Sequence, residues 1–559
     1  MNVRPAFLLL ALSALLSSGC VYPLEREGTD GQYNALSLAL SLKSPGDVLE
    51  GPATKMSAAI TQDGLPFRGI EQVYVIPFQT ASAAPVGNGS TRKGDRNVII
   101  QNPSIGKTGL VAYNNAHLYN IAILPRYMNR VLAYGKAMDD GSVTTKDGKH
   151  KNGVLTPAGL DNPDTPGAIS FSLEAVLETE DLKAINQKSD NMIAALNDVV
   201  EQLQATNDAD IRVFLAAFTA QNEITACSYQ SLYRLEQTLL GALSEYSGTD
   251  PVAINALMRK ISSLQAARNA AGSGFPTSYG IPEGALGMWW NGHRFVKLIN
   301  GVNISLVPVT GYCYPPSLWY YANSPVRTSA DDNVKEQYKP QNETWRSILS
   351  YYSEGTIVQS STRSVAIEYQ LEYGVGLVEF HFLATTGNAE SAGGCPLKGI
   401  IIGDQKDVDY SFAPKSSESR FIYDNTISGV TLGGTSAGGT SQYVQMLVLP
   451  TADDQTVHFA LEFQNNTSSA FQCQQGKVQP NSRFYLAGEL VPGLGSKPDG
   501  ESISGVFDSD YKTTIYVRVT DLNKAYNTVP DLRDPQLELG VVAEMDWKQV
   551  EPGGSKLSF

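Results

Sequence analysis

One short motif in the chain has the spacing of a serine nucleophile. Residues 434–438 read Gly-Thr-Ser-Ala-Gly, and in α/β-hydrolases a G-x-S-x-G motif holds the serine on a sharp turn between a strand and a helix. Here a strand-like run, Tyr443–Leu449, follows in place of a helix, and His458 is the only histidine downstream. We therefore interpret the segment around Ser436 as a small-residue loop. The sequence predicts no catalytic set and no enzymatic activity.

Metal, cofactor and nucleic-acid chemistry find little support in the composition. The five Cys and five His show neither C-x-x-C nor H-E-x-x-H spacing, so no zinc-site pattern is present. No G-x-x-x-x-G-K-[ST] segment that could cradle a phosphate occurs. The formal charge is −14, whereas a protein that binds the phosphate backbone needs a basic surface. We expect no metal ion, no cofactor and no nucleic-acid partner.

The first twenty residues have the layout of an export signal. Arg4 precedes an apolar run, Ala6–Leu16, and small residues then lead to Cys20. This order is typical of a secretory signal peptide, and the apolar run is too short for a permanent membrane span. Because a cysteine directly after small residues resembles a bacterial lipobox, we predict a lipoprotein signal peptide over 1–19 and lipid on Cys20. A plain signal peptide is the alternative.

The other cysteines are candidates for disulfides, since an exported protein can oxidise its thiols. Four cysteines allow three pairings. Proximity in the sequence favours Cys227–Cys313 and Cys395–Cys473, and the other pairings stay open.

The first strand pattern lies at residues 33–43. Small residues alternate there with four leucines, which fall on one face: Leu36, Leu38, Leu40 and Leu42. Such alternation with period 2 predicts a half-buried strand. The residues after it, 44–55, are rich in Gly and Pro and predict a loop.

Strand patterns recur on both sides of the middle of the chain. They are Glu71–Phe78 and His117–Leu124 before it, and Ser364–Tyr369, Gly376–Leu383, Tyr443–Leu449, Val457–Phe463 and Thr513–Val519 after it. Polar, Gly-rich turns separate them without alternating helices, which favours antiparallel sandwiches over a parallel α/β sheet. With 18% charged residues, 50 Gly and 27 Tyr, the composition is typical of an exported, mainly β protein.

The middle of the chain has helical periodicity. Apolar residues recur every three to four positions in three stretches between about 178 and 271. The third stretch begins with Asp250, an N-cap candidate, and with Pro251 at the first helical position. Strand-like sequence resumes near Trp289 and Phe295. We therefore predict a small helical bundle inserted into β structure.

The last strand pattern is the most regular one. Apolar residues alternate with mostly polar ones near the C-terminus, which predicts one strand. Its apolar face consists of Leu537, Leu539, Val541, Ala543, Met545 and Trp547.

Several stretches, taken together and in order, resemble the fimbrillin superfamily of Bacteroidales, whose members are pilus subunits. The stretches are Tyr314–Pro325, Phe484–Leu490, Gly505–Phe507, Asp510–Thr514, Ala525–Arg533 and the terminal strand ending in Trp547. The lipobox followed by one alternating strand resembles the family too. The helical segment departs from the simplest subunits.

The resemblance implies two transthyretin-like antiparallel β-sandwich domains, here with the α-helical insertion in the N-terminal domain. We expect the propeptide candidate at 20–56, the N-terminal domain at 57–328 and the C-terminal domain at 329–559, with the helices at about 178–271. The resemblance also implies transport to the outer membrane as a lipoprotein.

Assembly by strand exchange is a further implication of the resemblance. A protease removes the first strand, here Leu36 to Leu42, and a neighbouring subunit adds its terminal strand, here Leu537 to Trp547, by β-augmentation. Lys55 is the first candidate for the cleavage site, and Lys43 is the second. If neither is cut, the groove stays plugged and the protein is a terminal tip subunit.

The sequence thus predicts a surface fimbrial subunit with a structural and adhesive role, in contact with other fimbrial subunits and a host or bacterial surface ligand. The helical insertion favours a tip or accessory position, because a bulky module is easiest to place where no neighbour stacks. The alternative function is a surface glycan-binding lipoprotein outside any pilus. Trp289, Trp290 and Trp319 could then stack on sugars.

Overall fold

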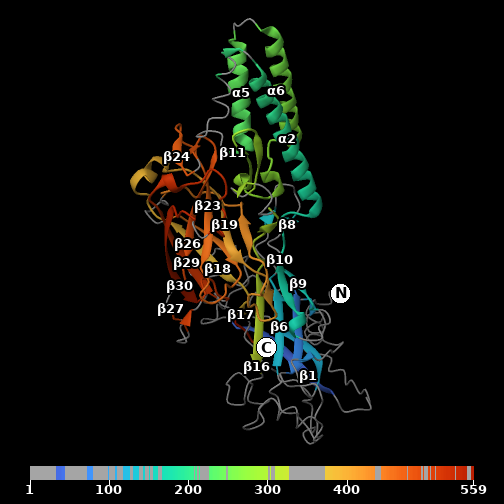
Figure 1. The fold of residues 1–559 in the computed structure, drawn as a ribbon. Helices are drawn as coiled ribbons and strands as arrows, with labels where there is room; N and C mark the ends of the chain where they lie inside the picture. The colour runs from blue at the N-terminus through green and yellow to red at the C-terminus, as the bar shows by residue number, and fades with distance from the viewer. Residues whose placement is uncertain are drawn as a thin grey trace, which may run out of the picture.

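The computed structural model shows a mainly β protein with one helical module (Figure 1). The structure describes residues 33–43, 72–79, 98–99, 108–109, 117–125, 130–137, 143–144, 150–151, 155–160, 166–206, 208–209, 213, 226–246, 250–299, 302–303, 309–325, 372–434, 442–474, 476–492, 495–496, 502–503, 505–509, 511–534, 537–549 and 556–558.

Two sheets of the C-terminal half form a sandwich. The sheet that we call the inner sheet has the order β15(Tyr312–Cys313), β21(Arg420–Asp424), β19(Leu397–Gln405), β23(Val457–Gln464), β26(Arg483–Leu490). The outer sheet has the order β22(Gln442–Val448), β18(Gly376–Phe382), β29(Tyr511–Val519), β30(Val541–Gln549). Two pairs depart from the predicted antiparallel arrangement, because β15 runs parallel to β21 and β18 runs parallel to β29. Both parallel pairs join strands that are more than a hundred residues apart in the sequence, which leaves room for the long crossover that parallel pairing needs.

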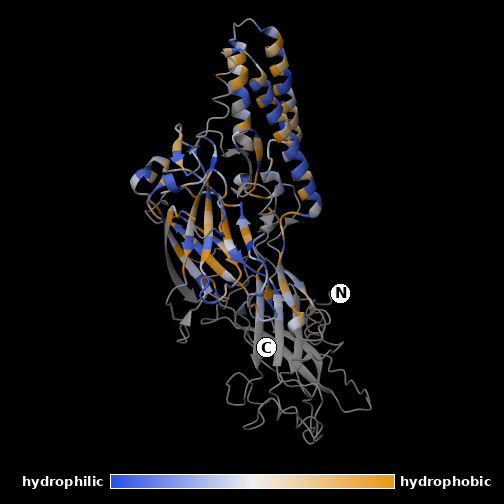
Figure 2. Ribbon diagram, viewed as in Figure 1, coloured by the Kyte–Doolittle hydropathy of each residue, from blue (hydrophilic) through white to orange (hydrophobic). Residues whose placement is uncertain are grey.

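The sandwich core follows from alternation along the central strands. Ile400 and Ile402 of β19 and Phe459 of β23 contribute to one buried cluster, together with Phe380 of β18 and Ile515 of β29. Successive side chains of a strand point to opposite faces, so these apolar residues share the space between the two sheets. Figure 2 shows hydrophobic residues concentrated on these strands.

The intervening residues of the inner sheet belong to a second cluster. Ile401, Tyr423, Ala460 and Tyr485 lie between the core residues and pack instead with the helical module. The inner sheet is therefore covered on both faces.

The helical module follows the predicted pattern closely. Its elements are α2(Thr179–Ala205), α5(Tyr229–Ser244), α6(Pro251–Ala271) and a sheet of β11(Ala226–Ser228), β12(Leu286–Trp290), β13(Phe295–Ile299) and β14(Val302–Asn303). Asp250 caps α6 by accepting a hydrogen bond from Ala253 N at 3.0 Å, with Pro251 at the first helical position. The predicted cap is thus confirmed.

The chain runs into the helical module and out of it through two adjacent segments. Val176 N donates to Tyr312 O at 2.9 Å and Tyr314 N donates to Glu174 O at 3.1 Å, which forms an antiparallel stem. β15, directly after the module, adds to the edge strand β21 of the inner sheet. The stem therefore joins the module to the C-terminal sandwich.

The N-terminal strands form two further sheets. One has the order β31(Lys556–Ser558), β1(Tyr33–Lys43), β5(His117–Pro125), and the other has the order β17(Glu372–Tyr373), β16(Trp319–Pro325), β6(Arg130–Lys136), β2(Gln72–Gln79), β3(Val98–Ile99), with β4(Thr108–Gly109) also on β2. These sheets lie at the opposite end of the molecule from α5 and α6 (Figure 1).

Short elements complete the described part of the chain. The strands β20(Val408–Asp409), β10(Ser170–Leu173) and β9(Leu155–Ala158) form one sheet. Three two-stranded pairs are β7(Val143–Thr144) with β8(His150–Lys151), β24(Phe471–Cys473) with β25(Gly476–Val478), and β27(Gly495–Ser496) with β28(Ser502–Ile503). The 3-10 helices are η1(Pro166–Ala168), η2(Thr277–Tyr279), η3(Glu283–Ala285), η4(Val309–Gly311), η6(Gly387–Ala392) and η7(Leu522–Lys524).

Strand pairing crosses the predicted boundary between the N-terminal and C-terminal domains. β15 precedes the expected boundary at 328 and joins the C-terminal inner sheet, whereas β17 follows that boundary and pairs with β16 of an N-terminal sheet. The boundary itself and the predicted strand Ser364–Tyr369 lie outside the described residues.

Candidate strand-exchange interface

The first strand has the bounds that the sequence predicts. β1 pairs antiparallel with β5 from Tyr33↔Pro125 to Ser41↔His117. On its other side, β1 pairs with β31 over three residues, with Leu42 opposite Leu557. The two ends of the described chain therefore meet in one sheet.

The pairing of β5 is what makes β1 a candidate plug. Among the described strands, β5 pairs only with β1, because the sheet order ends there. Removal of β1 would leave the N–H and C=O groups of β5 without a strand partner, and an unpaired edge of this kind readily binds another strand.

The C-terminal candidate strand begins four residues later than the sequence predicts. β30 starts at Val541, whereas Leu537 packs with the second cluster and Val541 with the sandwich core. These two residues were expected on one face of a single strand, and that expectation is wrong. Gly540 N donates to Ala487 O of β26 at 3.0 Å, so the chain crosses there from the inner to the outer sheet.

Gly540 permits this crossing because it has no side chain. A Cβ at this position would lie 2.8 Å from Leu486 Cδ2, which is closer than packed atoms tolerate. After the crossing, β30 pairs with β29 over nine residues, with Ala543 opposite Val517, Met545 opposite Ile515 and Trp547 opposite Thr513. This ladder places β30 at the edge of its own outer sheet, next to β29.

Several predicted functional residues lie outside the described part of the chain. These are Cys20 and Lys55, and Ser436 of the predicted small-residue loop lies outside it as well. Lys43 is the last residue of β1 and lies opposite Lys556 of β31. Within the described residues, no helix is both long and apolar enough to cross a membrane.

The predicted disulfides are not formed. Cys313 and Cys395 are buried thiols, which excludes both Cys227–Cys313 and Cys395–Cys473. Cys313 Sγ lies 4.0 Å from the Arg420 guanidinium, which donates to it, and burial raises the Cys313 pKa to about 11. Burial likewise raises the pKa of Cys395, although the backbone N–H groups of Asn466 and Thr467 partly offset this. Each of these two thiols thus contacts neighbouring polar groups and is not bonded to a second cysteine.

Of the three tryptophans considered for sugar stacking, Trp319 is buried and Trp289 and Trp290 are half-buried. Trp319 is 2% exposed, and its ring contacts Phe171 at 5.2 Å between centroids. The prediction that a sugar could stack on Trp319 is therefore wrong. Trp290 is half-buried and packs against Phe295 at 5.1 Å.

The sequence did not reveal a polar network between the inner sheet and the module. Glu462 of β23 accepts hydrogen bonds from Tyr423 Oη at 2.6 Å and from Tyr485 Oη at 3.1 Å. Arg483 Nε lies 3.4 Å from Glu462 and 3.3 Å from Glu283 of η3. Burial and the adjacent Glu462 carboxylate raise the pKa of Tyr423 and of Tyr485, so both hydroxyls remain protonated donors.

The network reaches the backbone of the module at Gly284. Its N–H donates to Tyr485 Oη at 2.8 Å and its carbonyl accepts from Val529 N at 2.9 Å. A Cβ on Gly284 would lie 2.5 Å from the Tyr485 ring, so this close contact requires glycine. The sequence signal for this network was Glu462, a glutamate between Leu461 and Phe463 in β23.

Comparison with known proteins gives similarity of low degree only. No family model matches the chain, and no curated protein matches it. A solved structure described as a candidate cell adhesion protein from Parabacteroides distasonis is 9% identical, covers 92% of this chain and 98% of that one, and has a TM-score of 0.32. One so described from Bacteroides eggerthii is 7% identical over 93% and 96%, with a TM-score of 0.32.

A second structure from Parabacteroides distasonis with the same description is 10% identical over 92% of this chain and 99% of that one, with a TM-score of 0.25. TM-scores of this size carry no argument about fold or function.

Proposed function

We propose that the protein is a structural subunit of a cell-surface fimbrium, with an adhesive role and with assembly by strand exchange. One observation carries the proposal: β5 has β1 as its sole strand partner among the described residues. One cut in the loop that follows β1 would release this strand. β1 therefore controls whether another strand can bind to the edge of β5.

The order of the elements supports the same reading. The export signal, the lipobox at Cys20 and β1 follow one another in the sequence, so an anchored chain would hold β1 near the membrane. The helical module lies at the far end of the molecule (Figure 1). A module in that position is available to a ligand, which fits a tip or accessory subunit of the fimbrillin type with two transthyretin-like domains.

The donor role of β30 has a structural cost in this proposal. β30 completes its own outer sheet through a nine-residue ladder with β29, so donation to a neighbour requires that this ladder opens. β31, which already pairs with β1, has only three paired residues to release. The proposal accordingly includes the segment from Val541 to Ser558 as the donated part.

N-terminal sequencing of the protein recovered from purified surface filaments tests the proposal. A start at Met56 or Ser44 means that β1 is removed and that the subunit accepts a donor strand within the shaft. A lipid-blocked start at Cys20 means that β1 stays and that the subunit is terminal. Absence of the protein from filaments would overturn the proposal and favour a free surface-binding lipoprotein.

A further inference from the structure

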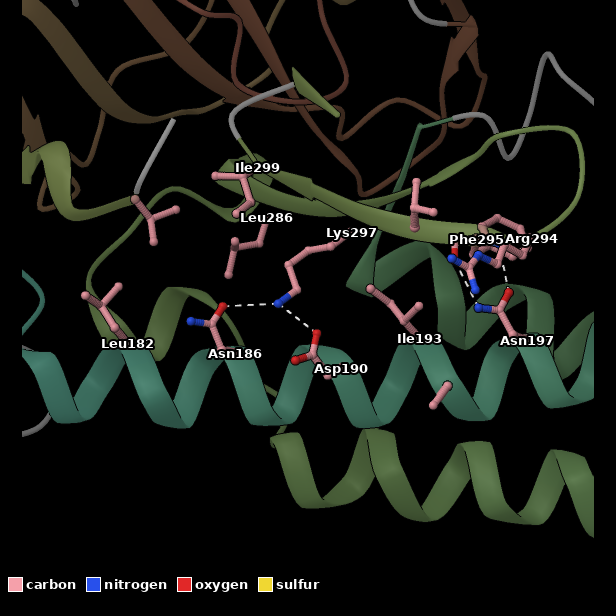
Figure 3. Close-up of a pocket in the computed structure, with 13 residues that line it drawn as sticks. Leu182, Asn186, Asp190, Ile193, Asn197, Leu286, Arg294, Phe295, Lys297 and Ile299 are labelled. Carbon is pink, nitrogen blue, oxygen red and sulfur yellow. Dashed lines mark hydrogen bonds and ion pairs between the residues drawn. The ribbon is translucent and has the colours of Figure 1, made fainter. Parts of the chain in front are cut away.

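A groove lies between α2 and the hairpin of β12 and β13 in the helical module (Figure 3). Its volume is about 700 Å³, which lies in the range of roughly 300–1,000 Å³ that ligand pockets occupy. The side chains of α2 from Leu182 to Asn197 form one wall, and those of β13 from Phe295 to Ile299 form the other. Neither the candidate plug strand nor β30 contributes to it.

Two sets of hydrogen bonds hold the walls of this α2–β13 groove at a fixed spacing. The Asn197 side chain donates to Phe295 O at 3.0 Å and accepts from Phe295 N at 2.8 Å, as a neighbouring strand would. The Lys297 ammonium reaches across to Asp190 at 2.7 Å and Asn186 at 3.1 Å (Figure 3). Because the walls are fixed without a ligand, binding would require little ordering of the site.

The charge of the groove differs from that of the protein. Arg294 and Lys297 are cationic and Asp190 is the one carboxylate of the lining, whereas the whole chain carries −14. Asp190 already pairs with Lys297. The exposed Arg294 guanidinium has no hydrogen-bond or ion-pair partner in the described part of the chain. A ligand carboxylate would supply one, and planar guanidinium–carboxylate pairing is strong and directional.

The shape and lining favour an extended peptide over a sugar. From Leu182 to Asn197 the groove follows about 22 Å of helix at 1.5 Å per residue, which matches six or seven residues of extended chain at about 3.3 Å each. Leu182 and Ile193 provide half-buried apolar contacts along it. Phe295 is the only aromatic residue of the lining and is 1% exposed, so no ring face is open for a sugar to stack on.

We propose that the α2–β13 groove binds an extended acidic peptide segment of a partner protein. A carboxylate of the peptide pairs with Arg294, and apolar side chains contact Leu182 and Ile193. The inference deepens the proposed adhesive role and rests on it for access to partners. The test below uses the isolated protein, so its failure leaves filament incorporation untouched and can be told apart from failure of the proposed function.

The experiment is selection of linear peptides from a random phage-displayed library on the full chain, followed by fluorescence anisotropy of the enriched peptides. We expect sequences that combine Asp or Glu with apolar residues. The variant Arg294→Glu should weaken their binding at least about tenfold, since loss of a close charge pair across an interface exceeds 1.4 kcal/mol.

Arg259→Glu is the matched control. Arg259 is an exposed arginine of α6 that does not line the groove, so the same charge change should leave binding within twofold. Circular dichroism of each variant checks that the module stays folded. Equal loss in both arginine variants, enrichment of peptides without acidic residues, or no enrichment at all would each overturn the proposal. The protein could instead bind an acidic sugar on a glycan array. If Arg294→Glu abolished that binding, the peptide proposal would be overturned in favour of an acidic sugar ligand.

Discussion

The inner sheet has two buried faces that differ in kind. The face toward the outer sheet is apolar, with Ile400, Ile402 and Phe459 in its centre. The opposite face carries Tyr423, Glu462 and Tyr485 under the helical module.

The difference concerns specificity of packing. Apolar burial is strong but tolerates repacking, whereas buried hydrogen-bonding groups are satisfied in one arrangement only. The apolar face supplies stability to the sandwich, and the polar face defines how the module is oriented on it. Variants on the two faces should therefore have different effects.

The largest effect is expected from Phe459→Ala in the sandwich core. Phe459 is 0% exposed, and removal of a fully buried phenyl ring costs about 3–5 kcal/mol. Denaturant unfolding followed by circular dichroism should show the sandwich and the module losing stability. Val491→Ala is the control, since Val491 is 54% exposed, and its change should stay below about 0.5 kcal/mol. A loss below 1 kcal/mol for Phe459→Ala would contradict the assignment of this face.

A somewhat smaller and more local effect is expected from Glu462→Ala. The change removes the acceptor of both tyrosine hydroxyls and one carboxylate partner of Arg483. Unpaired buried polar groups of this kind cost about 2–4 kcal/mol. Hydrogen exchange should accelerate in η3 and its neighbours while β18 stays protected. Glu390→Gln, at an exposed glutamate of η6, should leave exchange unchanged, and uniform acceleration in Glu462→Ala would argue against a module-specific role.

Tyr485→Phe should have an intermediate effect of about 1–2 kcal/mol. It keeps the ring and removes only the hydroxyl that joins Gly284 N to Glu462. A double-mutant cycle with Glu462→Gln should show a coupling energy above about 0.5 kcal/mol, as expected for groups of one network. Additive effects of the two changes would show that the hydroxyl and the carboxylate act independently.

The smallest effect is expected from His458→Gln, and it should depend on pH. The hydrogen bond to Asp404 raises the His458 pKa, burial opposes this, and the charges of Asp404 and Glu489 raise it further. A raised pKa stabilises the folded protein below the unfolded value of about 6.5, and this contribution disappears as the pH rises through the folded value. The stability difference between wild type and variant should thus be larger at pH 5.5 than at pH 9. Equal differences at both would exclude a charged His458.

Local features of this fold could be predicted from the sequence, because they depend on neighbouring residues. The bounds of β1 follow from strict alternation, and the start of α6 follows from the Asp250–Pro251 pair. Both are settled within a few residues, where side-chain period and capping determine the backbone conformation.

Features that join distant segments could not be predicted. The alternation from Leu537 to Trp547 continues through the crossing at Gly540, so the pattern alone hides the change of sheet. The parallel partner of β18 lies more than a hundred residues away in β29. Glu462 likewise gives no sign that η3 will cover it, and the α2–β13 groove forms only where two separate elements meet.

The stem that carries the helical module has a mechanical consequence. Leu173 is held by Asp407 and Arg420, with Leu173 N to Asp407 Oδ1 at 3.0 Å and Arg420 Nη1 to Leu173 O at 2.7 Å, while Cys313 is held in the ladder with β21. Both ends of the module are thus attached to β21 of the inner sheet, one through Arg420 and the other through β15. A tensile load that pulls the two ends of the chain apart would pass from one attachment to the other through that sheet. The roughly 140 residues of the module between them would lie outside this load path.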